Sequence, residues 1–184
     1  EKRRGTRGDY CKGLIQATEM YLLAHNYRKA GTQITQIINT DYTDLNTDLR
    51  DKIKFLAVKI NYYKGNLNEA SEMIADVIAY RESKVVKKVQ VKDAVSGEMK
   101  WKKLAAKQLK QRKRAYAAAL NLSGNIYRKK GNYQKSDSIL NTASAWIRKN
   151  LNKKDISYVD NLHAMAQLYD DQEQLPGAAN FFKK

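Results

Sequence analysis

The stretch Leu120–Ala143, LNLSGNIYRKKGNYQKSDSILNTA, decides the fold of this 184-residue chain. Gly124 is a small residue inside a helical pattern, and it allows a second helix to approach closely. Gly131, seven residues later, is placed to end the first helix in a left-handed conformation. Tyr133 and Leu140 are also seven residues apart, so they share one face of a following helix. The stretch therefore predicts two packed helices joined by a short turn.

The same pattern recurs along the chain. Three residues, Tyr27, Leu67 and Leu175, occupy the position in the repeat that Tyr133 occupies here. The four positions are separated by 40, 66 and 42 residues, so the middle interval contains one period plus about two dozen extra residues. Pairs of helices that repeat in this way stack on one another, because one pair cannot bury its apolar face alone. A generic bundle of helical hairpins is the alternative.

The pattern resembles the tetratricopeptide repeat (TPR) family. Gly124, Tyr127, Gly131, Tyr133 and Ala143 stand in that family's order, whereas its usual alanine and leucine are replaced by Ser136 and Ser123. The common period of the family is about 34 residues. The period near 42, and the phrase NLHAMAQLYDDQEQLPGAANFF at 161–182, are similar to the longer repeats of kinesin light chain. The resemblance implies an all-α fold, a right-handed α-solenoid of about four TPR-like helical hairpins.

We expect one repeat domain at 10–184, preceded by a disordered basic tail at 1–9. The chain ends within the last predicted helix, which predicts further repeats or a capping helix after it. The expected helical pairs lie at about 10–40, 47–80, 101–149 and 156–184, with an insertion at 81–100.

The charge is concentrated in one region. The chain has 35 Lys and Arg against 19 Asp and Glu, a net charge of +16. Residues 81–130 contain 16 of the cations and only 3 of the acids, so the rest of the chain is close to neutral. Within the insertion, Val89 and Val91 alternate with polar residues, as do Met99 and Trp101 after a polar turn. This alternation predicts a β-hairpin, and a disordered polar loop is the alternative.

After the insertion the pattern becomes helical, and it predicts a single helix from about Trp101 to Lys130, roughly 45 Å long. One face of this helix is basic and has no acidic partner one turn away, so its cations repel one another. An anionic partner and a merely solvated face are both open interpretations. The basic face consists of Lys102, Lys103, Lys107, Lys110, Lys113 and Arg114.

The resemblance implies that the unpacked faces of the first helices line a groove that binds a peptide. Arg128 and Lys129 occupy the same repeat offsets as Asp170 and Asp171, and we prefer a surface ion pair between repeats over a polarised groove. The implied groove residues are Phe55, Lys59, Tyr62 and Tyr63 in the second pair, Asn121, Asn125, Arg128 and Lys129 in the third, and Asp160, His163, Gln167, Asp170 and Asp171 in the fourth.

No catalytic, cofactor or metal motif is present in the sequence, and His25 and His163 lie in different repeats, so we expect no enzyme. No apolar run is long enough to span a bilayer. The single Cys11 excludes an internal disulfide, which is compatible with a cytoplasmic location without establishing it.

The leading hypothesis is a non-enzymatic protein–protein interaction scaffold that binds a peptide or protein segment in its groove, with the basic helix as a second contact surface. The net charge would suit an acidic partner. One alternative is RNA binding through the basic face at 100–114. The other is that the array is the sensor or scaffold portion of a larger signalling or secretion protein.

Overall fold

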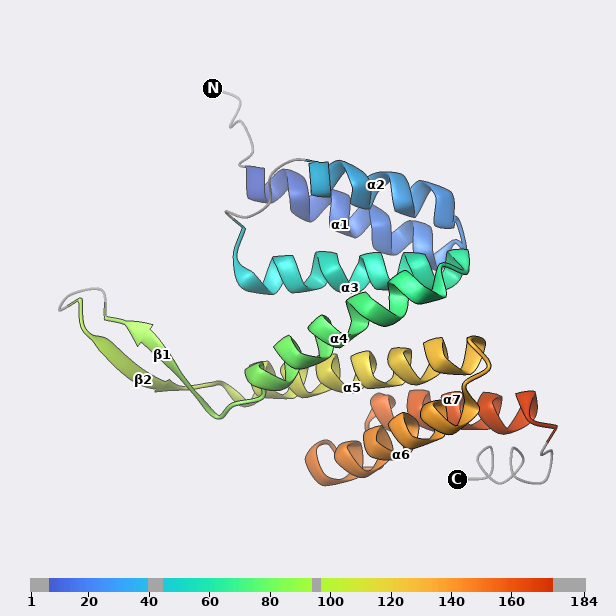
Figure 1. Cartoon of the computed structure of the whole chain (residues 1–184). Helices are drawn as coiled ribbons and strands as arrows, with labels where there is room; N and C mark the ends of the chain where they lie inside the picture. The colour runs from blue at the N-terminus through green and yellow to red at the C-terminus, as the bar shows by residue number, and fades with distance from the viewer. Residues whose placement is uncertain (1–6, 40–44, 94–96, 174–184) are drawn as a thin grey trace. The chain divides into compact units, whose positions relative to one another are not determined.

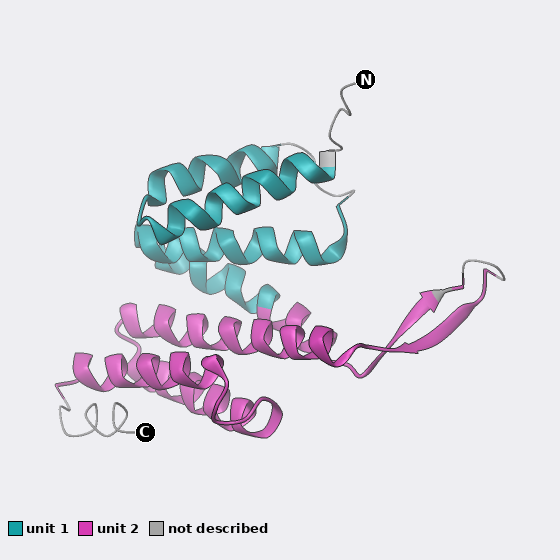
Figure 2. Cartoon of the chain, turned by 180° about the vertical axis from the view of Figure 1, so that it is seen from behind, with its two compact units in different colours: residues 1–77 teal, residues 78–184 magenta. Residues whose placement is uncertain are grey.

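The computed structural model describes residues 7–39, 45–93 and 97–173, which form seven helices and one two-stranded hairpin (Figure 1). The chain divides into two compact units, residues 1–77 and residues 78–184 (Figure 2). The predicted all-α class with a short strand insertion is confirmed.

The first unit contains α1 (Arg7–Leu23), α2 (Tyr27–Asn39), α3 (Thr47–Lys64) and the greater part of α4 (Leu67–Lys84). Helix α3 begins where the side chain of Asn46 accepts a hydrogen bond from the Leu49 backbone. It ends at Gly65, whose φ of +84° is left-handed. The core of this unit is aliphatic, with side chains from each of the first three helices, and its most deeply buried members include Ile15, Ile37 and Ile53.

The second unit contains α5 (Ala106–Lys129), α6 (Tyr133–Asn150) and α7 (Ile156–Asp171), and each of these helices packs against the other two. Their apolar faces form a shared core, because Ile126, Leu140, Ile147 and Leu168 are completely buried. This packing brings the first helices of two successive predicted repeats, α5 and α7, side by side.

The roles predicted for two glycines are confirmed. A Cβ atom on Gly124 would lie 2.5 Å from Cδ2 and 2.6 Å from Cγ of Leu140, so any side chain there would force Leu140 of α6 to shift. Gly131 has a φ of +74° and follows the end of α5, and Asn132 then caps α6 by accepting a hydrogen bond from Lys135. Ser136, where the family has alanine, is buried, and its hydroxyl donates to the Gly124 carbonyl at 2.8 Å.

The insertion forms an antiparallel hairpin of β1 (Lys88–Lys92) and β2 (Met99–Lys103), so the strand alternative is the correct one. Directly opposed residues include Gln90 with Trp101 and Lys88 with Lys103. The hairpin extends away from the helices of its unit, and every residue of β2 is exposed (Figure 1).

The prediction of a single helix from Trp101 to Lys130 is wrong. Trp101, Lys102 and Lys103 belong to β2, and the helix begins only at Ala106. Pairing with the first strand decides the difference, because the Leu104 backbone N–H still donates to the Lys87 carbonyl at 3.0 Å. The predicted basic face is therefore divided between a strand and a helix.

At the chain ends, α1 already includes residues 7–9, so the predicted tail ends earlier than expected. Residues 1–6 and the predicted second helix of the fourth pair, at 174–184, lie outside the described residues.

Candidate functional site

The predicted groove residues form two sets, one in each unit. Those of the second unit lie on α5 and α7, whose packing brings side chains about 40 positions apart in sequence into contact. Those of the first unit lie on α3.

The second set is organised around Arg128, whose side chain is only 11% exposed. Its Nη1 lies 2.6 Å from Oδ2 of Asp171, and its Nη2 donates to Oε1 of Gln167 at 3.2 Å. Its Nε donates to Oδ1 of Asn125 at 3.4 Å. The ion pair preferred for this position is therefore confirmed, with Asp171 as the acid. The three partners hold the guanidinium in one geometry across the two helices.

The network continues along α7 toward solvent. Nε2 of Gln167 lies 3.0 Å from Nε2 of His163, one helical turn away, and His163 is exposed. Asp160, Asp170 and Lys129 are also exposed. We call the surface formed by Asn125, Arg128, His163, Gln167 and Asp171 the α5–α7 face. It presents amide, imidazole and carboxylate groups that both donate and accept hydrogen bonds.

Asn121, by contrast, lies beneath this face. It is buried, and its Oδ1 accepts a hydrogen bond from Nδ2 of Asn161 at 2.9 Å. Asn161 also donates to the Leu140 carbonyl at 3.0 Å, so the two asparagines join α5, α6 and α7 inside the core. Asn121 therefore contributes to the packing between helices and not to the predicted groove surface. Sequence analysis missed Asn161, although an asparagine on the same helical stripe as Met165 and Leu168 was a signal.

In the first unit, the predicted residues form an aromatic patch. The rings of Tyr63 and Tyr27 stack at 4.7 Å with an interplanar angle of 5°, and Tyr62 meets Tyr63 edge to face at 5.1 Å. Tyr62 is buried, whereas Tyr63 is 43% exposed. Partial burial, and then the neighbouring Tyr27, raise the pKa of Tyr63. Nearby on α3, Nζ of Lys59 lies 5.3 Å from the ring centroid of Phe55.

The helical part of the basic face contacts the loop between α6 and α7. Arg114 binds the carboxylate of Asp155 through Nε and Nη2, at 2.9 to 3.1 Å, and Lys110 lies 3.5 Å from the same carboxylate. Lys113 donates to the Asn150 carbonyl at 3.0 Å. Lys107 is exposed. Lys110, Lys113 and Arg114 have no acid one helical turn away, but each of them contacts an oxygen of a residue distant in sequence.

Asp155 is an unusual carboxyl, since its side chain is only 1% exposed. Burial by itself raises its pKa. The hydrogen bond from Arg114, those from Ser157 and the charge of Arg114 outweigh burial and lower the pKa to about 2. Asp155 is therefore ionised at neutral pH and acts as a structural anion between α5 and α7.

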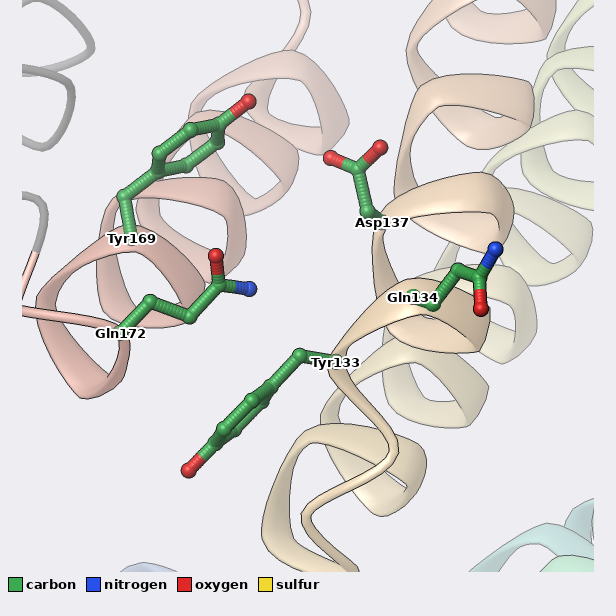
Figure 3. Close-up of a pocket in the computed structure, with 5 residues that line it drawn as sticks. All are labelled: Tyr133, Gln134, Asp137, Tyr169 and Gln172. Carbon is green, nitrogen blue, oxygen red and sulfur yellow. The ribbon is translucent and has the colours of Figure 1, made fainter.

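A shallow hollow of about 630 Å³ lies beside α6 and the end of α7. Tyr133, Gln134, Asp137, Tyr169 and Gln172 line it (Figure 3). One Asp137 oxygen accepts from Asn141 at 3.0 Å, and the other has no hydrogen-bond partner within the described part of the chain. The sequence pattern identified Tyr133 as a repeat position but not as part of a site, and the five residues include no nucleophile paired with a base.

Across residues 7–39, 45–93 and 97–173, no group of three or more His, Cys, Asp or Glu side chains is arranged to hold a metal ion. None of the helices in these ranges is both long and apolar enough to cross a bilayer.

Two solved structures and one family model are similar to this chain. Two solved structures described as kinesin light chain nearly identical TPR-like repeats of Podosopora anserina, one of them a point variant, align with 98% and 97% of this chain and 94% of theirs. Their sequence identity to this chain is 12%, and the TM-scores are 0.43 and 0.42. No curated protein matches the sequence. The tetratricopeptide repeat family model matches residues 115–184. The predicted resemblance to the tetratricopeptide repeat family is therefore confirmed for the part of the chain that contains most of α5 and all of α6 and α7.

Proposed function

We propose that this chain is a non-enzymatic interaction module that binds an extended protein segment on the α5–α7 face. Tetratricopeptide repeats generally mediate protein–protein interaction, and folds of this kind are typically scaffolds without catalytic activity. The observation that carries the proposal for this chain is the Arg128 network, which fixes polar groups from two neighbouring first helices on one surface.

An extended segment has backbone N–H and C=O groups that no secondary structure satisfies. Gln167 and Asn125 can supply both donors and acceptors to such groups, and His163 supplies a ring nitrogen. Because Arg128 already holds Gln167 and Asn125 in place, binding orders fewer side chains and its entropic cost is lower.

The charges on this surface give the bound segment a direction. Asp170 and Asp171 lie at the end of α7, and Asp171 is already paired with Arg128. We therefore expect a donor or a cation of the partner to lie toward Asp170. The aromatic patch of the first unit, with Tyr63 exposed, is an additional surface for an apolar side chain of a partner.

A random-peptide display library, selected on the whole chain, tests the proposal without a known partner. Enriched peptides are synthesised and titrated by calorimetry against the wild type and against the variant His163→Ala/Gln167→Ala. We expect the double variant to weaken binding at least tenfold, because it removes two hydrogen-bonding groups from the face.

The matched control is Ser138→Ala, which truncates an exposed polar residue of α6. It should leave the affinity unchanged. Failure to enrich any peptide, or equal affinity of the selected peptides for the wild type and the double variant, would contradict a binding role for the α5–α7 face.

A further inference from the structure

The structure separates the cations of the basic region into two groups. The first group serves the fold of the second unit. The Arg81 side chain is buried and donates to the Ala115 carbonyl at 2.8 Å, and Arg112 donates to the Lys84 carbonyl at 3.2 Å. Lys113 is held by the last residue of α6, and Arg114 is held by Asp155 at the start of α7. These cations are not available to a partner without a loss of internal bonds.

The second group lies on the hairpin. Lys88, Lys102 and Lys103 are exposed, and none of the three forms an ion pair with any residue in the described ranges. Lys100 is different, because its Nζ lies 3.0 Å from Oδ2 of Asp93. Three cations without an ion pair in the described ranges therefore lie on the strands, which project from the helices of their unit (Figure 1).

The strand register places these side chains on two faces. Directly opposed residues of an antiparallel pair point to the same face, and neighbours along a strand point to opposite faces. Lys88 opposes Lys103, and Gln90 opposes Trp101. These four residues, together with Met99, form what we call the Trp101 face. Lys102 and Lys100 lie on the opposite face with their partners Val89 and Val91.

The Trp101 face carries three kinds of recognition group. Lys88 and Lys103 are like charges about 5 Å apart at Cα, which is unfavourable unless an anion lies between them. The indole of Trp101 is 67% exposed and lies two residues along β2 from Lys103. Gln90, across from it, offers an amide that both donates and accepts. A phosphate can lie between the two lysines, the flat side of a base can stack on the indole, and the edge of a base can form hydrogen bonds with the Gln90 amide.

We propose that the Trp101 face binds single-stranded nucleic acid, with a phosphate between Lys88 and Lys103 and a base stacked on Trp101. An acidic peptide would satisfy the lysines but would leave the indole without a stacking partner. A bilayer surface fits less well, because both faces of the hairpin carry lysines and neither can be buried in acyl chains. With only a few groups in contact, the affinity should be modest, on the order of 10 µM at low salt.

Adjacent lysines give a matched pair of variants. Lys103→Glu and Lys102→Glu change the net charge equally, one residue apart, on opposite faces of β2. Fluorescence anisotropy with labelled oligouridylate RNA of about 12 nucleotides, and with the equivalent DNA, measures binding to the whole chain. We expect Lys103→Glu to weaken binding about tenfold and Lys102→Glu to weaken it less than threefold. Circular dichroism of each variant establishes that it folds.

Stacking is tested separately from charge. Trp101→Ala should weaken binding about tenfold or more without a change in net charge, and Trp101→Phe should restore most of the affinity. Lys88→Gln/Lys103→Gln should make the dependence of log Kd on log salt shallower by about 0.7, since the two lysines share one phosphate and each phosphate contact on a single strand contributes about 0.7.

Several results would overturn the proposal. The first is that neither RNA nor DNA binds at low salt. The second is that Lys102→Glu and Lys103→Glu lose the same amount of affinity. The third is that Trp101→Ala binds as tightly as the wild type. Polyglutamate and vesicles containing anionic lipid are titrated in parallel. Binding to either one at least as tight as to RNA would identify a different class of partner and would also contradict the proposal. None of these measurements involves the α5–α7 face.

Discussion

Arg114 of α5 and Asp155 at the start of α7 form a two-pronged ion pair, with Nε and Nη2 of the arginine 2.9 to 3.1 Å from the carboxylate oxygens. Oδ1 of Asp155 also accepts a hydrogen bond from the Ser157 backbone at 3.2 Å, so the same buried carboxylate caps α7. One side chain therefore fixes both the beginning of α7 and its position against α5.

Substitution of Asp155 should separate these two roles. Asp155→Ala removes the cap and the ion pair, and we expect it to lower the free energy of unfolding by about 2 to 3 kcal/mol. Asp155→Asn keeps a side-chain acceptor for the cap, so it should cost about 1 kcal/mol less. Urea denaturation measures both values. Equal losses in the two variants would show that the cap contributes nothing measurable.

Asp155 also makes stability depend on pH. Its pKa falls from the ordinary value of 3.8 to about 2 on folding, so its contribution is complete above the unfolded value and is lost as pH falls through the folded value. The difference in pKa corresponds to about 2 kcal/mol. Between pH 5 and 2, the wild type should lose that much more stability than Asp155→Asn. Parallel stability curves for the two proteins would contradict this assignment.

Two glycine substitutions should have opposite effects. Gly124→Ala places a methyl group against Leu140 where α5 and α6 touch, and we expect a loss of about 1 to 3 kcal/mol. Gly13 is exposed in the middle of α1, and a Cβ there would meet nothing within 4 Å. Gly13→Ala should therefore stabilise the chain by up to about 1 kcal/mol. Thermal melting of both variants checks the sign. A stabilising Gly124→Ala would mean that the helices do not approach as described.

Substitution of the two buried asparagines should lower the free energy of unfolding by different amounts. Asn161→Ala leaves both Asn121 and the Leu140 carbonyl without their donor, whereas Asn121→Ala leaves the bond to Leu140 intact. We expect losses of about 2 to 3 and about 1 kcal/mol, respectively, in denaturant unfolding. Asn141→Ala, on the exposed side of α6, should change stability by less than about 0.5 kcal/mol. A larger effect at position 121 than at 161 would contradict the network.

The repeat could be predicted from the sequence because its signals are local. Gly131 can adopt a left-handed backbone without steric cost whatever surrounds it, and Gly124 allows the close approach of Leu140, sixteen residues later. The boundary between β2 and α5 could not be predicted in this way. Trp101 fits both the strand alternation and the helical period, and the choice depends on pairing with residues that precede it by more than ten positions.

The candidate site was predictable only in part, for the same reason. The repeat offsets placed Arg128 beside Asp171, since stacking brings equivalent positions of neighbouring repeats together. They did not distinguish Asn121, which is buried, from Asn125, which reaches the face. Nor could they show that Asp155 binds Arg114, because that contact joins a helix to a loop and depends on the three-dimensional packing of the unit.

Site-specific photo-crosslinking can show whether a partner segment lies across the α5–α7 face. A benzophenone amino acid is placed at position 160, one turn before His163 on α7, or at position 138 on the exposed side of α6, and each protein is irradiated with a selected peptide. We expect a crosslinked product from position 160 that excess unlabelled peptide suppresses, and little or none from position 138. Crosslinking from position 138 alone, or equally from both positions, would contradict it.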